Sequence, residues 1–129
     1  MAATPGRQMT VDRLTSVESF RGCTLAQLNE VARLAERIQV ANGEVLVREG
    51  RIGREFFLIL SGTAAVTRKG RQIDTLGPAD FFGEVAAVNP GPRDATVTAT
   101  TDMEVLIIGP REFDAMMDIP GLRHTLFGR

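Results

Sequence analysis

The spacing of hydrophobic positions changes twice along the chain. Between residues 24 and 36 apolar side chains recur every three or four positions, which is the period of an amphipathic helix. Thr24 and Gln27 have the spacing of a capping box at the start of this helix. The apolar positions of the predicted helix are Leu25, Leu28, Val31, Ala32 and Ala35.

From Ile38 onward the period falls to about two, in short segments separated by glycine, proline and asparagine. Many short strands with such turn residues between them indicate an all-β barrel or sandwich. The predicted strands cover residues 37–41, 45–48, 56–61, 64–68, 72–76, 96–100 and 105–108. Gly70, between Lys69 and Arg71, is expected at the tip of a hairpin.

A helical period returns after the last predicted strand. Pro110 suits the first turn of a helix, and Pro120 separates that helix from a short third one. The apolar positions of these two helices are Phe113, Met116, Met117, Leu122, Leu126 and Phe127. The order is therefore helix, strands, helices.

Composition and length indicate one domain. The chain has 129 residues, of which 43% are hydrophobic and 24% charged, close to an average soluble globular protein. Residues 1–10 show no apolar period and are expected to form a flexible lead, with a single domain over residues 11–129. Cys23 is the only cysteine, which favours a reducing cytoplasm, and no N-terminal apolar segment marks a secretory signal.

Charge and residue types exclude several classes of function. The formal net charge is −1 and no long Lys/Arg block occurs, so direct nucleic-acid binding is not expected. The apolar runs are too short to span a membrane. His124 is the only histidine, so a barrel metal site with several histidine ligands is excluded, and no nucleophile elbow supports a hydrolase. We expect neither catalysis nor a metal.

The segment from Phe81 to Val97 has residue types that suit a sugar phosphate. A helical turn over 84–88, entered through Gly83, would present unpaired N–H groups to an anion. Arg93, after a loop rich in proline and glycine, has a planar fork that suits paired phosphate oxygens. The carboxylate of Glu84 would accept a hydrogen bond from a sugar hydroxyl.

The same segment resembles the phosphate-binding cassette of cyclic nucleotide-binding domains, as in protein kinase A regulatory subunits and catabolite activator protein. The resemblance rests on the run from Phe82 to Ala86 and on the later Pro92-Arg93 and Ala95-Thr96-Val97. Barrel glycines and apolar strands extend it over about residues 20–127.

The resemblance implies a mainly β fold, an antiparallel jelly-roll β-barrel (double-stranded β-helix) flanked by α-helices, that binds cyclic AMP or cyclic GMP, with cyclic AMP favoured. It gives Gly83 a close backbone approach, Glu84 the ribose 2′-hydroxyl and Arg93 the cyclic phosphate. The implied ligand-binding residues are Phe82, Gly83, Glu84, Val85, Ala86, Arg93, Asp94 and Ala95.

Three positions depart from the family's pattern. Asp94 stands where Ala, Ser or Thr is usual and brings a carboxylate near the expected phosphate; Ala79 replaces a common glycine, and Arg54 replaces a common acidic residue. The C-terminal helix, which in the family closes over the base, is short here.

Two functions fit these observations. One is a sensor that couples nucleotide binding to the position of its C-terminal helix and acts on a protein partner or as a homodimer. The other is a degenerate domain of this family that binds a protein and no nucleotide.

Overall fold

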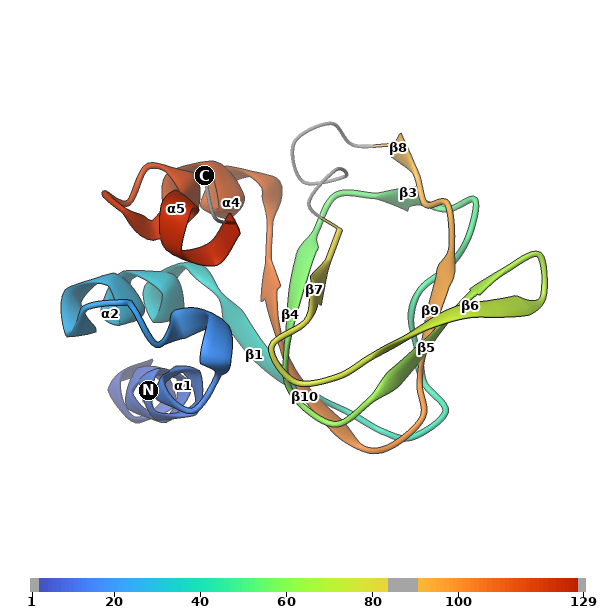
Figure 1. The fold of residues 1–129 in the computed structure, drawn as a ribbon, viewed down its shortest axis with the longest axis horizontal. Helices are drawn as coiled ribbons and strands as arrows, with labels where there is room; N and C mark the ends of the chain where they lie inside the picture. The colour runs from blue at the N-terminus through green and yellow to red at the C-terminus, as the bar shows by residue number, and fades with distance from the viewer. Residues whose placement is uncertain (1–2, 84–90, 128–129) are drawn as a thin grey trace.

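The computed structural model of the chain describes residues 3–83 and 91–127. The strands form two four-stranded antiparallel sheets and a two-stranded one, and the helices lie together on one side of the strands (Figure 1). The first sheet has the order β1 (Glu36–Val40), β10 (Met103–Ile108), β4 (Phe56–Ser61) and β7 (Phe81–Phe82). The second has the order β2 (Val45–Val47), β9 (Thr96–Ala99), β5 (Ala64–Arg68) and β6 (Arg71–Leu76), and β3 (Ile52–Gly53) pairs with β8 (Gly91–Pro92).

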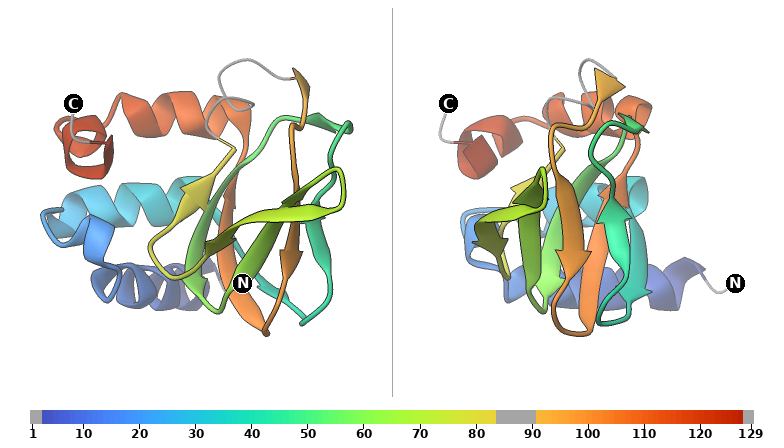
Figure 2. Two further views of the ribbon diagram at one scale, coloured as in Figure 1. Left: turned by 45° about the vertical axis from the view of Figure 1, so that its right-hand side comes forward. Right: turned by 90° about the vertical axis from the view of Figure 1, so that its right-hand side faces the viewer.

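The helices precede and follow the strands in the chain. They are α1 (Ala3–Thr15), the 3-10 helix η1 (Glu18–Phe20), α2 (Leu25–Leu34), α4 (Pro110–Met117) and α5 (Leu122–Phe127). Figure 2 shows them on one face of the first sheet, with the second sheet on the other. This arrangement confirms the predicted fold class, antiparallel β with flanking helices. Within the described residues, the strands form two opposed four-stranded sheets and the β3–β8 pair.

Strands β4 and β10 of the first sheet are buried on both faces, which explains the unbroken apolar run of β4. Phe56 and Leu58 belong to the cluster that packs against the helices, whereas Ile59 belongs to the cluster between the two sheets. Successive side chains of a strand point to opposite faces, so a strand covered on both sides is apolar at every position. The site described below lies between the sheets.

Several local predictions are confirmed. The Thr24 side chain accepts from the Gln27 backbone and the Gln27 side chain accepts from the Thr24 backbone, which is a complete capping box. Helix α2 ends at Leu34, two residues before its predicted end. Lys69 and Gly70 both have positive φ, 51° and 79°, as the tight turn of the β5–β6 hairpin requires.

Residues 3–10, which the sequence analysis assigns to a flexible lead, are the first part of α1. The helix is held by its C-terminal half, where Val11 and Leu14 are buried in the helix-side cluster. Arg13 adds a salt bridge to Glu104 of β10. Because these anchors lie beyond residue 10, the lead itself carries no apolar period that would reveal the helix.

The strand boundaries near the site also differ from the prediction. Gly91 and Pro92 were expected in a loop but pair with β3 as strand β8. Arg93 follows β8 directly, and β9 begins at Thr96, the first residue of the strand predicted over 96–100. Strands of two residues are too short to show an alternating pattern, so β3, β7 and β8 were not predicted.

Ala79 has a left-handed backbone with φ of 78°, a conformation that favours glycine. Its N–H donates to the carbonyl of Ile59 at 3.0 Å, in the turn that leads into β7. Glycine, which is common at this position in the family that the sequence resembles, adopts such a conformation without strain.

Candidate functional site

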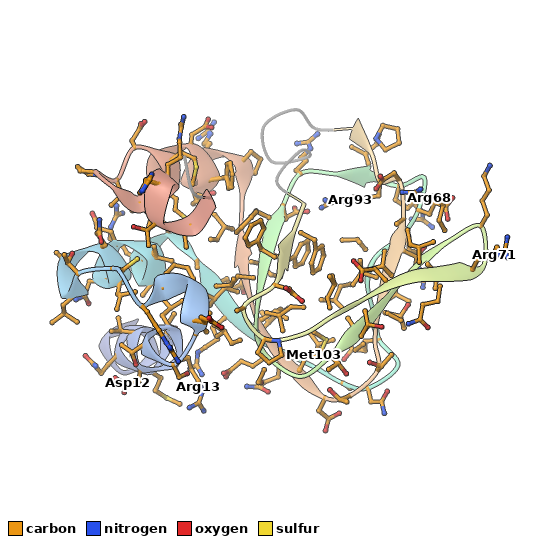
Figure 3. The ribbon with its side chains drawn as sticks, viewed as in Figure 1. Asp12, Arg13, Arg68, Arg71, Arg93 and Met103 are labelled. Atoms are coloured by element: carbon orange, nitrogen blue, oxygen red, sulfur yellow. The ribbon has the colours of Figure 1, made fainter. Side chains whose placement is uncertain are left out.

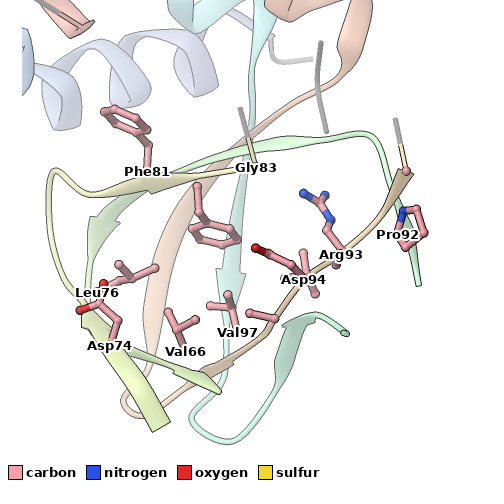
Figure 4. Close-up of a pocket in the computed structure, with 13 residues that line it drawn as sticks. Val66, Asp74, Leu76, Phe81, Gly83, Pro92, Arg93, Asp94 and Val97 are labelled. Atoms are coloured by element: carbon pink, nitrogen blue, oxygen red, sulfur yellow. The ribbon is translucent and has the colours of Figure 1, made fainter. Parts of the chain in front are cut away.

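A pocket of about 500 Å³ opens between the second sheet and β7, within the size range of small-molecule sites (Figure 4). Its wall is largely apolar and comes from β2, β5, β6, β7 and β9. The apolar residues that line it are Val47, Val66, Leu76, Phe81, Phe82, Pro92, Ala95 and Val97. Three charged side chains, Asp74, Arg93 and Asp94, also line it.

Arg93 is the buried cation of this pocket. Its side chain is only 8% exposed, and Nη2 donates to the Glu55 carbonyl at 3.0 Å. The Glu55 carboxylate lies 3.7 Å from the same nitrogen, and the guanidinium carbon lies 5.8 Å from the centre of the Phe57 ring. Burial lowers the pKa of Arg93, while the Glu55 and Asp94 carboxylates oppose this shift. An arginine remains charged under such a shift.

Two glycines, Gly53 and Gly83, leave room for the guanidinium of Arg93. A Cβ on Gly53 would collide with Nε of Arg93, and a Cβ on Gly83 would lie 2.9 Å from its Nη1 and collide with the carbonyl of Glu55. Gly83 also has a φ of 90°, which disfavours any side chain. Among the described residues, Nε of Arg93 is buried without a hydrogen-bond partner.

Asp94 is paired with a second arginine. Arg68 of β5 donates from Nε to the Asp94 carbonyl at 3.0 Å, and its Nη2 lies 3.3 Å from Oδ2 of Asp94. The Asp94 side chain is 88% exposed. Figure 3 shows the side chains of Arg68, the last residue of β5, and of Arg93, which follows β8. The carboxylate expected near the phosphate is thus partly neutralised by Arg68.

The two aromatic residues of β7 lie on opposite faces of the first sheet. Phe82 stacks on Phe57 with ring centres 4.7 Å apart and an angle of 7° between the rings. Phe81 packs against Phe56, whose ring also contacts Phe113 of α4. The pocket wall and the C-terminal helix are therefore linked through adjacent residues of one short strand.

The structure brings five of the predicted ligand-binding residues together in the pocket: Phe82, Gly83, Arg93, Asp94 and Ala95. The other three, Glu84, Val85 and Ala86, and the predicted turn at 84–88 lie outside the described residues.

Sequence reasoning missed Gly53, Glu55, Arg68 and Asp74 as parts of this site. Three of these reach it through contacts distant in the chain, which leave no local signal. Asp74 does leave a local signal in the sequence, because it interrupts the apolar alternation of its strand.

The described residues contain no group of three or more His, Cys, Asp or Glu side chains that would hold a metal ion. Within the same part of the chain, no helix has the length and apolar character needed to cross a bilayer.

Comparisons with known proteins agree on one family. The family described as "Cyclic nucleotide-binding domain" matches residues 37–119. A cAMP-dependent protein kinase regulatory subunit from Yarrowia lipolytica is 40% identical over 98 residues, which are 74% of this chain and 26% of that protein. The chain thus spans about a quarter of this curated relative.

Two solved structures are similar over most of the chain. The regulatory domain of Toxoplasma gondii PKA with cAMP has a TM-score of 0.78 and 27% identity, covering 97% of this chain and 49% of that one. Thermus thermophilus catabolite activator protein has a TM-score of 0.74 and 25% identity, covering 85% and 55%.

Proposed function

The chain belongs to the cyclic nucleotide-binding domain family, and from this premise we propose that it is a regulatory sensor that binds cyclic AMP, in preference to cyclic GMP, beside Arg93. The proposed role is ligand binding and not catalysis. The observation that carries the proposal is the buried guanidinium of Arg93, enclosed by two glycines at one end of a largely apolar pocket.

The phosphate is assigned to Arg93. A guanidinium that is 8% exposed and has a buried, unpaired Nε has already lost most of its hydration, so an anion that reaches it gains a charge-assisted hydrogen bond. Its present partner, the neutral carbonyl of Glu55, leaves the positive charge only weakly compensated by a carboxylate at 3.7 Å. Binding the phosphate supplies the missing negative charge.

The rest of the nucleotide is assigned by chemistry. The wall that includes Val66, Val97 and Phe82 suits the flat apolar faces of a base. Glu84 is proposed to accept from the ribose 2′-hydroxyl, and the backbone of Val85, Ala86 and Ala95 to contact the phosphate.

Regulation is proposed to pass from the pocket to the C-terminal helices and from there to a protein partner, either a second copy or another chain. The name of the Yarrowia lipolytica relative, a kinase regulatory subunit, favours a protein partner. The described lining residues all precede α4, so any response of α4 and α5 is indirect.

The test is a calorimetric titration with cyclic AMP and cyclic GMP, repeated with Arg93→Ala. We expect cyclic AMP to bind more tightly, and the variant to lose roughly 2 to 5 kcal/mol of binding free energy because the phosphate loses its cationic partner. Arg111→Ala, on the exposed surface of α4, is the matched control and should bind like the unaltered chain. Binding by Arg93→Ala within a factor of two would show that the phosphate is not held by Arg93.

A second function is favoured by Asp94, whose carboxylate lines the pocket of an anionic ligand. In that case the domain is a degenerate copy that binds a protein and no nucleotide. A folded, thermally stable chain that shows no heat or melting shift with either nucleotide at millimolar concentration would support this second function.

A further inference from the structure

Strand β6 reverses the usual alternation of an amphipathic strand. Its register with β5 places Asp74 opposite Val66, and side chains opposite one another on antiparallel strands share a face. Val66 and Leu76 pack against the cluster between the sheets and line the pocket, as does Asp74. Ile73, the neighbour of Asp74, points the other way and is 51% exposed. Asp74, which is itself exposed, thus lies on the pocket face, while Ile73 lies in solvent on the opposite face.

Such a reversal costs stability, because the apolar side chain of Ile73 stays in water instead of packing between the sheets. Proteins break local pattern rules of this kind mainly at functional sites. The function must be one that a carboxylate performs better than the valine or leucine that the alternation favours at this position.

Asp74 lies at the end of the pocket away from Arg93. Figure 4 shows Asp74 beside Leu76 at one end and Arg93 at the other, with Val66 and Val97 between them. This step rests on the proposed function: a nucleotide whose phosphate lies at Arg93 extends its base along the apolar wall toward Asp74.

The Oδ2 oxygen of Asp74 is available to accept a hydrogen bond from a ligand. Its Oδ1 accepts from the Thr75 N–H at 2.8 Å, and among the described residues Oδ2 has no hydrogen-bond partner. Asp94, the other carboxylate of the pocket, is engaged by Arg68. An ionised carboxylate only accepts hydrogen bonds, so the group that meets Oδ2 must be a donor.

We propose that Asp74 determines base specificity by accepting a hydrogen bond from an exocyclic amino group of the purine. If the base had a carbonyl oxygen in the same place, two hydrogen-bond acceptors, this oxygen and the Asp74 carboxylate, would face each other without a hydrogen between them. A ligand without the amino group leaves the carboxylate without this hydrogen bond, so the amino-bearing base is preferred.

Cyclic IMP is the reference ligand for the test. It differs from cyclic AMP in having an oxygen in place of the 6-amino group, and from cyclic GMP only in lacking the 2-amino group. Calorimetric titration of the chain with all three nucleotides should show at least about tenfold tighter binding of one amino-bearing ligand than of cyclic IMP. Which ligand shows the preference identifies the amino group that is recognised.

Asp74→Asn should reduce this preference to within about threefold, because an amide both donates and accepts. The asparagine Oδ1 can still accept from Thr75, so the fold is expected to be retained. Asp74→Ala, which removes the acceptor without adding a donor, is the second variant if the first unfolds. Asp114→Asn on the exposed face of α4 removes the same charge away from the pocket and should leave the ratio unchanged.

Two results would overturn the inference in distinguishable ways. If the unaltered chain binds the three nucleotides equally, or if its preference persists in both Asp74 variants, the base assignment is wrong while the proposed function stands. If it binds none of the three, the proposed function fails and the base assignment fails with it.

Discussion

At the scale of single residues, the absence of a side chain at Gly53 leaves the space that the buried guanidinium of Arg93 occupies. A methyl group there would collide with Nε of Arg93, although Gly53 has no positive φ. The effect of Gly53→Ala is therefore steric and not conformational. We expect the displaced Arg93 to bind cyclic AMP at least tenfold more weakly, which corresponds to about 1.4 kcal/mol.

Gly77→Ala is the matched control for this prediction. Gly77 also lacks a positive φ, and a Cβ on it would meet nothing within 4 Å. Isothermal titration of both variants measures the difference. Equal affinity of Gly53→Ala and Gly77→Ala would mean that Arg93 does not hold the phosphate from the place where it lies in the structure.

The Arg68–Asp94 pair supplies a second residue-scale prediction. Asp94→Ser should tighten cyclic AMP binding by removing a negative charge near the phosphate, with the larger gain at low salt. Arg68→Ala should weaken binding because it leaves the Asp94 carboxylate uncompensated. Both side chains are about half exposed or more, so each effect is expected to be only about threefold.

The coupling between these two substitutions distinguishes this explanation from a direct contact. In the Asp94→Ser background, Arg68→Ala should have almost no effect, which a double-mutant cycle at two salt concentrations will measure. If Arg68→Ala weakens binding equally in both backgrounds, Arg68 contacts the nucleotide itself and does not act through Asp94.

At the scale of elements, Glu104 joins the N-terminal helix to the first sheet. This residue of β10 is buried, with its side chain 6% exposed, and its two oxygens accept from Arg13 of α1 at 2.8 Å and from Arg37 and Gln39 of β1 at 2.8 and 2.9 Å. Three side chains from two elements thus converge on one carboxylate.

Glu104→Ala should destabilise the domain by about 2 kcal/mol. Removing one partner of a buried ion pair leaves the other uncompensated, and Arg37 is only 19% exposed, although the half-exposed Arg13 can regain water. The expected fall in Tm is several degrees. Glu36→Ala, at the exposed start of β1, is the control, and a fall no larger than that of the control would contradict the role given to Glu104.

The sequence was informative where the determinants of an element are local. The capping box of Thr24 and Gln27, the Lys69-Gly70 turn and the proline start of α4 all depend on neighbours within four residues, and the structure confirms them. Helix α1 depends instead on a partner 91 positions away, Glu104, so its first turns were read as a flexible lead.

The same distinction divides the predictions about the site. The cassette residues from Phe82 to Ala95 are close in sequence and were found as a motif. The contact of Arg93 with Gly53 and the Arg68–Asp94 pair bring together three different segments, which only the tertiary structure reveals. The inward-facing Asp74 depends on strand register, since a shift of one residue would place Ile73 there.

At the scale of the whole molecule, the first sheet separates the pocket from the helices. Phe82 and Phe57 form a stacked pair on the pocket side, while Phe81, Phe56 and Phe113 form a chain of ring contacts on the helix side. Because Phe81 and Phe82 are consecutive, a shift of β7 on ligand binding moves both sets of rings. Strand β7 is thus the element through which binding would bias the position of α4 and α5.

Phe81→Ala tests this coupling. If β7 transmits binding, hydrogen exchange of the unaltered chain with saturating cyclic AMP should change protection in α4 and α5, because Phe113 of α4 contacts Phe56, which contacts Phe81 of β7. Phe81→Ala should bind within about fivefold of the unaltered chain, since its ring points away from Val66 and Val97 in the pocket (Figure 4).

The protection change in α4 and α5 should be lost in the Phe81 variant even though nucleotide still binds. Phe82→Ala is the converse control: it removes the stack on Phe57 at the pocket wall and should weaken binding while leaving the Phe81–Phe56 contact in place. Such coupling requires an element with two positions whose populations depend both on the pocket and on the C-terminal helices. The Phe81 and Phe82 variants test whether β7 is this element. If Phe81→Ala keeps the full protection change at saturating ligand, or if the unaltered chain shows none, β7 does not transmit binding to the helices.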